Sequence, residues 1–125
     1  MTYYLAVAAG GAMGAVSRYW LVMSINSVTA LRFPWGTMTV NLLGALLIGV
    51  VYVLLMERSN PSETLRALLI AGFLGAFTTF SAFSLDALQL LLAGRLLSAL
   101  AYVLSSVVLC ILLTWVGIGL ARALF

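Results

Sequence analysis

Gly72-Phe73-Leu74-Gly75-Ala76-Phe77-Thr78-Thr79-Phe80-Ser81-Ala82-Phe83-Ser84 lies inside a long hydrophobic segment, yet it contains two glycines, four hydroxyl side chains and four phenylalanines. Glycine and threonine are weak helix formers. A backbone break at membrane depth is tolerated only where protein buries it or where it lines a watery path. The stretch therefore predicts a functional site inside a membrane rather than a plain lipid-facing helix.

The composition around this stretch is that of an integral membrane protein. Of 125 residues, 65% are hydrophobic and 7% are charged, and the chain has neither lysine nor histidine. So few charges exclude a soluble domain. The six arginines are scattered, which excludes a nucleic-acid-binding surface. We expect no enzyme, because there is no nucleophile–base pair or carboxylate dyad. The single cysteine, Cys110, is expected to serve packing.

Four apolar segments are each long enough to cross a bilayer, which takes about 20 helical residues. They cover residues 3–24, 37–56, 67–94 and 96–121. The sequence thus predicts an all-α integral membrane protein with a single membrane domain over residues 1–125.

The third segment is longer than a bilayer requires. As one continuous helix, residues 67–94 would extend about 42 Å, against a hydrocarbon core of about 30 Å. A break within residues 72–79 would absorb the excess. We also expect the prolines Pro34 and Pro61 to lie at helix ends, and a tight turn at Gly94-Arg95.

The arginines give no preferred orientation in the membrane. One side of the predicted topology holds Arg58, Arg66 and Arg122, and the other holds Arg32, Arg95 and, if its side chain snorkels that way, Arg18. Arginine in short loops normally sets orientation. An even balance predicts insertion both ways and therefore an antiparallel homodimer.

Small residues in the first segment, Gly10, Gly11, Gly14 and Ala15, allow close helix contact either within a subunit or across such a dimer.

Three polar side chains stand out within the predicted spans. Asn41 lies four residues after Thr37 on one helix face, and it serves either as interhelical glue or as a pore-lining group. Arg18 either snorkels to the headgroups or forms an electropositive vestibule. Asp86 either caps a half-helix or faces a vestibule, where its charge would repel an anion.

The central stretch itself favours a small anion as ligand. At about 100° per residue, Phe77, Phe80 and Phe83 form one stripe of a continuous helix, beside a stripe of hydroxyls. Hydroxyl and amide donors without a carboxylate suit an anion, and aromatic rings carry a positive edge. Carbonyl oxygens released by the break would suit a hard cation such as sodium. An aromatic stripe that serves only core packing stays an open alternative.

Three motifs make the chain familiar. They are Gly10-Gly11-Ala12-Met13-Gly14-Ala15-Val16-Ser17-Arg18-Tyr19, Pro34-Trp35-Gly36-Thr37-Met38-Thr39-Val40-Asn41-Leu42-Leu43-Gly44, and Gly72-Phe73-Leu74-Gly75 followed by Thr78-Thr79-Phe80-Ser81-Ala82-Phe83. In this order and over nearly the whole length, the chain resembles the Fluc family of small bacterial fluoride channels. One position departs from the family pattern, because Ala82 stands where a threonine is expected.

The resemblance implies a fluoride-selective passive channel in the bacterial inner membrane, built as an antiparallel homodimer with a structural sodium ion at its interface. It places Phe80 and Phe83 with their ring edges against fluoride and makes Asn41 the pore asparagine. Arg18 matches the arginine of the first helix, and the carbonyls of Gly75 and Thr78 match the sodium ligands. A polar track would be completed by three further hydroxyl groups and a phenol, those of Thr37, Ser81, Thr114 and Tyr102.

Two other functions compete with the channel. Small multidrug transporters are also four-helix antiparallel dimers, but proton-coupled export needs an acidic residue in the first helix, where this chain has only Arg18. The second alternative is a structural membrane subunit whose polar residues serve packing alone.

Overall fold

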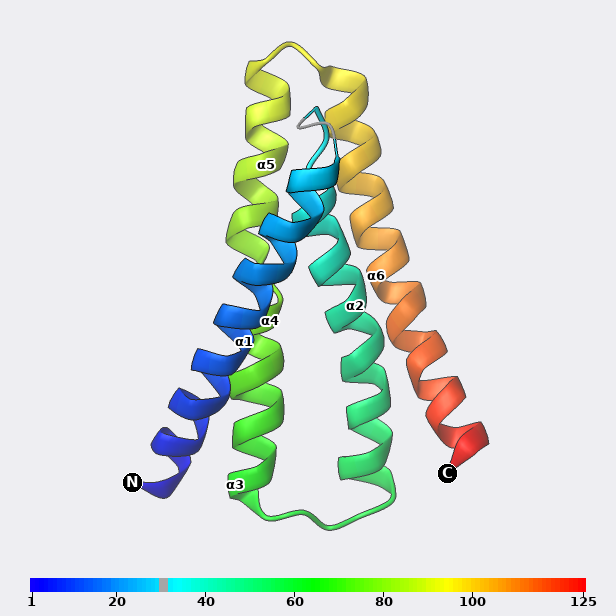
Figure 1. Cartoon of the computed structure of the whole chain (residues 1–125). Helices are drawn as coiled ribbons and strands as arrows, with labels where there is room; N and C mark the ends of the chain where they lie inside the picture. The colour runs from blue at the N-terminus through cyan, green and yellow to red at the C-terminus, as the bar shows by residue number, and fades with distance from the viewer. Residues whose placement is uncertain (30–31) are drawn as a thin grey trace.

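The computed structural model describes residues 1–29 and 32–125, and this part of the chain folds into helices without any strand. Four helical units are long and apolar enough to cross a membrane: Thr2–Val28, Trp35–Glu57, Glu63–Leu92 and Leu96–Leu124. Both chain ends lie at the same end of the bundle (Figure 1), as an even number of spans requires. The prediction of an all-α protein with four membrane spans is confirmed.

The first and last spans are single helices, α1 (Thr2–Val28) and α6 (Leu96–Leu124). The second span joins α2 (Trp35–Tyr52) to a wider π-helical turn, η1 (Val53–Glu57). The third consists of α3 (Glu63–Arg66), η2 (Ala67–Leu74), α4 (Gly75–Phe77) and α5 (Phe80–Leu92).

The third span breaks where its sequence predicts. Thr78 and Thr79 both have extended backbone angles, with ψ of 155° and 119°, and they lie near the middle of the span. Thr79 is the N-cap of α5, and its side-chain hydroxyl accepts a bond of 3.2 Å from the amide of Ala82. A threonine in this position satisfies an amide that has no partner within the helix. The break thus divides one crossing into two helical halves, α3 to α4 and α5.

Local signals account for the remaining helix ends. Pro34 is the N-cap of α2. The side chain of Ser62 accepts a hydrogen bond from the amide of Leu65 and caps the start of α3. The third span therefore begins at Glu63, four residues before its predicted start. The helix α1 continues to Val28, also four residues beyond the prediction. Gly94 has a φ of 72° and ends the turn after α5, as predicted. Of the first connection, residues 30 and 31 lie outside the described part.

Close backbone contact joins α1 to the first half of the third span (Figure 1). A Cβ atom on Gly10 would lie 2.1 Å from the Leu68 carbonyl oxygen, and one on Gly14 would lie 2.2 Å from that of Phe73. A Cβ atom on Gly11, by contrast, would have no other atom within 4 Å. Small residues permit this approach of helices in lipid. Gly10 and Gly14 therefore serve packing within the subunit, whereas the Gly11 face is open.

The break also corrects one expectation about the aromatic residues. Phe77 belongs to α4 and stacks on Phe73, with ring centroids 5.8 Å apart. Phe80 and Phe83 belong to α5, on the other side of the break. The prediction that the three rings form a single stripe was wrong, because it required a continuous helix through Thr78 and Thr79.

Candidate functional site

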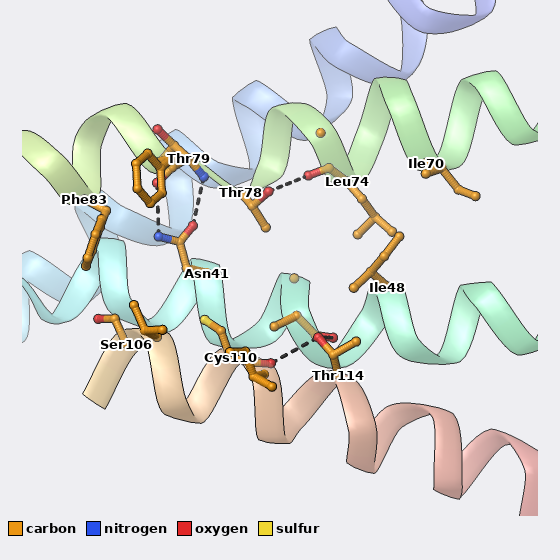
Figure 2. Close-up of a pocket in the computed structure, with 16 residues that line it drawn as sticks. Asn41, Ile48, Ile70, Leu74, Thr78, Thr79, Phe83, Ser106, Cys110 and Thr114 are labelled. Carbon is orange, nitrogen blue, oxygen red and sulfur yellow. Dashed lines mark hydrogen bonds between the residues drawn. The ribbon is translucent and has the colours of Figure 1, made fainter. Parts of the chain in front are cut away.

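A cavity of about 510 Å³ lies between α2, the broken third span and α6. Figure 2 shows side chains of all three segments around it. None of its sixteen lining residues carries a charge, and they include six of the predicted site residues: Asn41, Gly75, Thr78, Phe80, Phe83 and Thr114. Residues far apart in the sequence are thereby brought together by the fold.

Asn41 bridges the gap between α2 and the break with both ends of its side-chain amide. Its Oδ1 accepts a bond of 2.8 Å from the Thr79 amide, and its Nδ2 donates to the Thr79 carbonyl oxygen at 3.1 Å (Figure 2). The predicted interhelical contact is therefore present. Since an amide nitrogen carries two hydrogens and one is engaged here, a second donor remains at this cavity-lining residue. Pore lining and interhelical bonding are compatible at this residue.

The carbonyl groups of Gly75 and Thr78 are among those that lose their normal helical partners at the break. In a continuous helix, the Gly75 carbonyl oxygen would accept from the amide of Thr79, and that of Thr78 would accept from the amide of Ala82. Those amides donate instead to side chains, Asn41 Oδ1 and Thr79 Oγ1. Gly75 and Thr78 both line the cavity. The two carbonyls that the family resemblance assigned to sodium thus lose their usual helical donors at the break.

Arg18 points to the break rather than to the end of its helix. Its Nε donates to the Ala76 carbonyl oxygen at 3.0 Å, and the side chain is half-buried. The cation therefore stabilises the C-terminal end of α4, where the helix dipole favours positive charge. Without Arg18, the arginines divide three against two between the ends of the bundle, which still gives no strong orientation signal.

The two aromatic residues of α5 have very different exposure. Phe83 is 8% exposed and Phe80 is 77% exposed, with ring centroids 5.3 Å apart. Both line the cavity, so the cavity reaches the surface of the subunit at Phe80. Phe83 also contacts the ring of Tyr102, at 5.2 Å between centroids. Tyr102 itself is fully buried and lies behind Phe83.

The wall contributed by α6 contains two residues that the sequence analysis did not assign to the site. Ser106 and Cys110 line the cavity with Thr114, and Figure 2 shows Cys110 between the other two. Ser106 Oγ is buried without a hydrogen-bond partner among the described residues, whereas Thr114 Oγ1 donates to the Cys110 and Ala45 carbonyls. The regular four-residue spacing, beginning at Tyr102, was the signal that could have identified this face.

Four of the ten predicted site residues are not among those that line this cavity: Arg18 and Tyr102, described above, and Ser81 and Thr37. Ser81 is exposed and its hydroxyl is 3.2 Å from Thr79 Oγ1. Thr37 lines a second cavity of about 280 Å³ near the end of the bundle, together with Arg32, Asp86 and Arg95. Arg95 donates there to the Arg32 carbonyl. The second cavity is thus polar and charged, in contrast to the first.

Comparison with known proteins agrees with this geometry. The family model described as CrcB-like protein, Camphor Resistance (CrcB), matches residues 5–118. A protein of Hahella chejuensis named fluoride-specific ion channel FluC is 50% identical over 93% of this chain and 91% of its own length. A protein of the same name from Geobacter sulfurreducens is 46% identical over 99% of this chain and all of its own length. The resemblance inferred from the motifs is confirmed, and the chain belongs to the CrcB family.

Proposed function

We propose that this protein is a passive, fluoride-selective channel of the bacterial inner membrane that lets cytoplasmic fluoride leave the cell. The single observation that carries this proposal is the uncharged cavity at the break, lined by Asn41, Phe80 and Phe83. The names of the relatives support fluoride as the ion. Four membrane spans support a multi-pass membrane location.

The cavity can replace part of the water around a small anion without holding the ion tightly. Asn41 offers its remaining N–H group, and ring edges at Phe80 and Phe83 offer weak positive potential. Conduction requires binding that is favourable enough for the ion to enter and weak enough for it to leave. Among the described residues, no carboxylate lines the cavity to repel an anion.

Passive flow is sufficient for fluoride resistance. Neutral hydrogen fluoride crosses lipid and dissociates in the less acidic cytoplasm, which traps the anion. A negative membrane potential then drives fluoride outward with about 2.3 kcal/mol per charge per 100 mV. No chemical step is needed, in keeping with a channel family rather than an enzyme family.

We expect rapid fluoride efflux from liposomes that contain the purified protein, measured with a fluoride electrode. Chloride efflux under the same gradient should be far slower, because donors and ring edges spaced for a small anion fit the larger ion poorly. Empty liposomes provide the control. Equal permeability to the two ions, or no release of either by folded protein, would refute the proposed function.

The antiparallel homodimer is supported by what a single subunit leaves uncovered. Ser81 and Ser84 on α5 are exposed beside Phe80, and Gly75 is exposed at the break. Polar groups and irregular backbone at membrane depth need protein or water around them. A second copy that covers this face would satisfy that need, and the arginine distribution permits the opposite orientation.

A structural sodium ion between the two subunits is supported by the carbonyls of Gly75 and Thr78, whose usual helical donors are bonded to side chains instead. Carbonyl oxygens are suitable ligands for a hard cation, and broken membrane helices commonly bind sodium in this way. Two facing copies of the break would double the number of oxygens. The ion would hold the breaks together without taking part in conduction.

Sodium removal should therefore affect assembly as well as flux. We expect exchange of all sodium for a large organic cation, such as N-methyl-D-glucamine, to lower the melting temperature of the dimer and to stop fluoride efflux. Addition of sodium should restore both. If assembly, melting and efflux are the same with and without sodium, the sodium site is refuted while the channel function stands.

The multidrug-exporter alternative is not favoured. The first span contains no acidic residue for proton exchange, and its one charged group, Arg18, is bonded to the Ala76 carbonyl. The relatives named above are fluoride channels.

A further inference from the structure

Asp86 poses a problem for any anion channel, because its carboxylate lies in the middle of the helix that carries Phe80 and Phe83. It is half-buried and lines the smaller, polar cavity near the end of the bundle. Taken by itself, a negative charge repels an anion, and here it is opposed by Arg32 and Arg95 of the same cavity. The structure contains a contact that gives this carboxylate another task.

That contact is with Tyr102 of α6. The tyrosine is fully buried, and its hydroxyl donates to Asp86 Oδ2 at 3.4 Å. This is long for an O–H···O bond, but it is the only partner recorded for the hydroxyl among the described residues. A buried hydroxyl without an acceptor is costly. Asp86 therefore allows the phenol to occupy this interior position.

Tyr102 in turn fixes the aromatic residues at the end of the conduction cavity. Its ring lies 5.2 Å from that of Phe83 and meets Phe33 edge-on at 5.5 Å. Phe83 then contacts Phe80, at 5.3 Å. The contacts form a continuous series from the carboxylate through Tyr102 and Phe83 to the exposed ring of Phe80.

We propose that Asp86 is a positioning residue for conduction, whose carboxylate oxygen holds Tyr102 and thereby keeps the Phe83 ring in place at the cavity. The inference rests on the proposed channel function, which it extends by one residue. What Asp86 supplies is a hydrogen-bond acceptor of the right shape, not its charge.

Two substitutions separate the acceptor from the charge. Asp86→Asn keeps a side-chain oxygen in the same place, and its fluoride flux per folded channel should stay within about twofold of that of the original protein. Asp86→Leu has similar size but no acceptor, and its flux should fall at least about tenfold, a barrier change that misplacement of a contact ring can produce. Gln89→Leu is the matched control, since Gln89 lines the same small cavity one turn along α5; it should leave flux unchanged.

The link through Tyr102 is tested by a double variant that changes both residues. In Asp86→Leu with Tyr102→Phe, no hydroxyl is left without an acceptor, so the melting temperature and the flux should both exceed those of Asp86→Leu alone. Flux that falls equally in the Asn and Leu variants would show that the charge matters and would overturn the proposal. If the change in melting temperature of the double variant equals the sum of the changes caused by Asp86→Leu and by Tyr102→Phe separately, the two residues do not interact and the contact is overturned. Unchanged flux in the Leu variant would overturn it as well. The melting data decide this even if the protein conducts no fluoride, in which case the channel function fails separately.

Discussion

Replacement of Phe80 by isoleucine should nearly abolish fluoride efflux while the protein remains folded. The ring is 77% exposed and lines the cavity, so it contributes little to packing within the subunit. Its loss removes the positive ring edge from the conduction site. We expect a fall of at least about 100-fold in flux per channel, equivalent to about 2.7 kcal/mol in the barrier, measured by fluoride efflux from liposomes.

A matched control is available at the end of the chain. Phe125 is also exposed, at 67%, and is not among the residues that line the cavity. Phe125→Ile removes an exposed ring in the same way and should conduct normally. If Phe80→Ile protein with the original melting temperature and dimer content conducts at the original rate, the ring has no role in conduction and the structural-subunit alternative gains support.

Replacement of Asn41 by leucine should damage the fold of the break as well as conduction. Leucine has a similar size but cannot bond to Thr79, whose amide and carbonyl both depend on the asparagine side chain. Each backbone group left unsatisfied in the interior costs about 1–3 kcal/mol. We expect a large fall in melting temperature and in the yield of folded protein, measured by fluorescence-detected thermal denaturation in detergent.

Two further variants separate these effects. Asn26→Leu makes the same change near the end of α1, at a side chain that lines the smaller cavity, and should cost far less stability. Asn41→Asp keeps an oxygen for the Thr79 amide, so it should fold better than Asn41→Leu. Its negative charge on the cavity wall should still block fluoride. An Asn41→Leu protein as stable as the original would show that these bonds do not hold the break.

The fold was largely predictable because membrane constraints act on long segments. Four apolar runs and an overlong third segment were enough to predict four spans and a central break. The broken segment is shorter than the predicted range of residues 72–79. It comprises Thr78 and Thr79, because the capping hydroxyl of Thr79 decides where α5 begins.

The family motifs marked residues that the fold brings together, whereas the contacts around them were not foreseen. Asn41, Phe80, Phe83, Gly75 and Thr78 do meet at one cavity. Hydrophobic periodicity could not reveal which groups bond across the bundle, because such contacts join residues far apart in the chain. The Arg18 bond to Ala76 and the Asp86 bond to Tyr102 are examples. For the same reason, Cys110 was assigned to packing although it lines the cavity.

The break has a consequence for how the protein is made. Its backbone groups obtain partners from Asn41 on the second span and Arg18 on the first, both of which leave the ribosome before Thr78. When the third span enters the membrane, the groups that complete it are already there. Its polar centre can therefore be stabilised on arrival, whereas a chain with its spans in another order would expose that centre to lipid during synthesis.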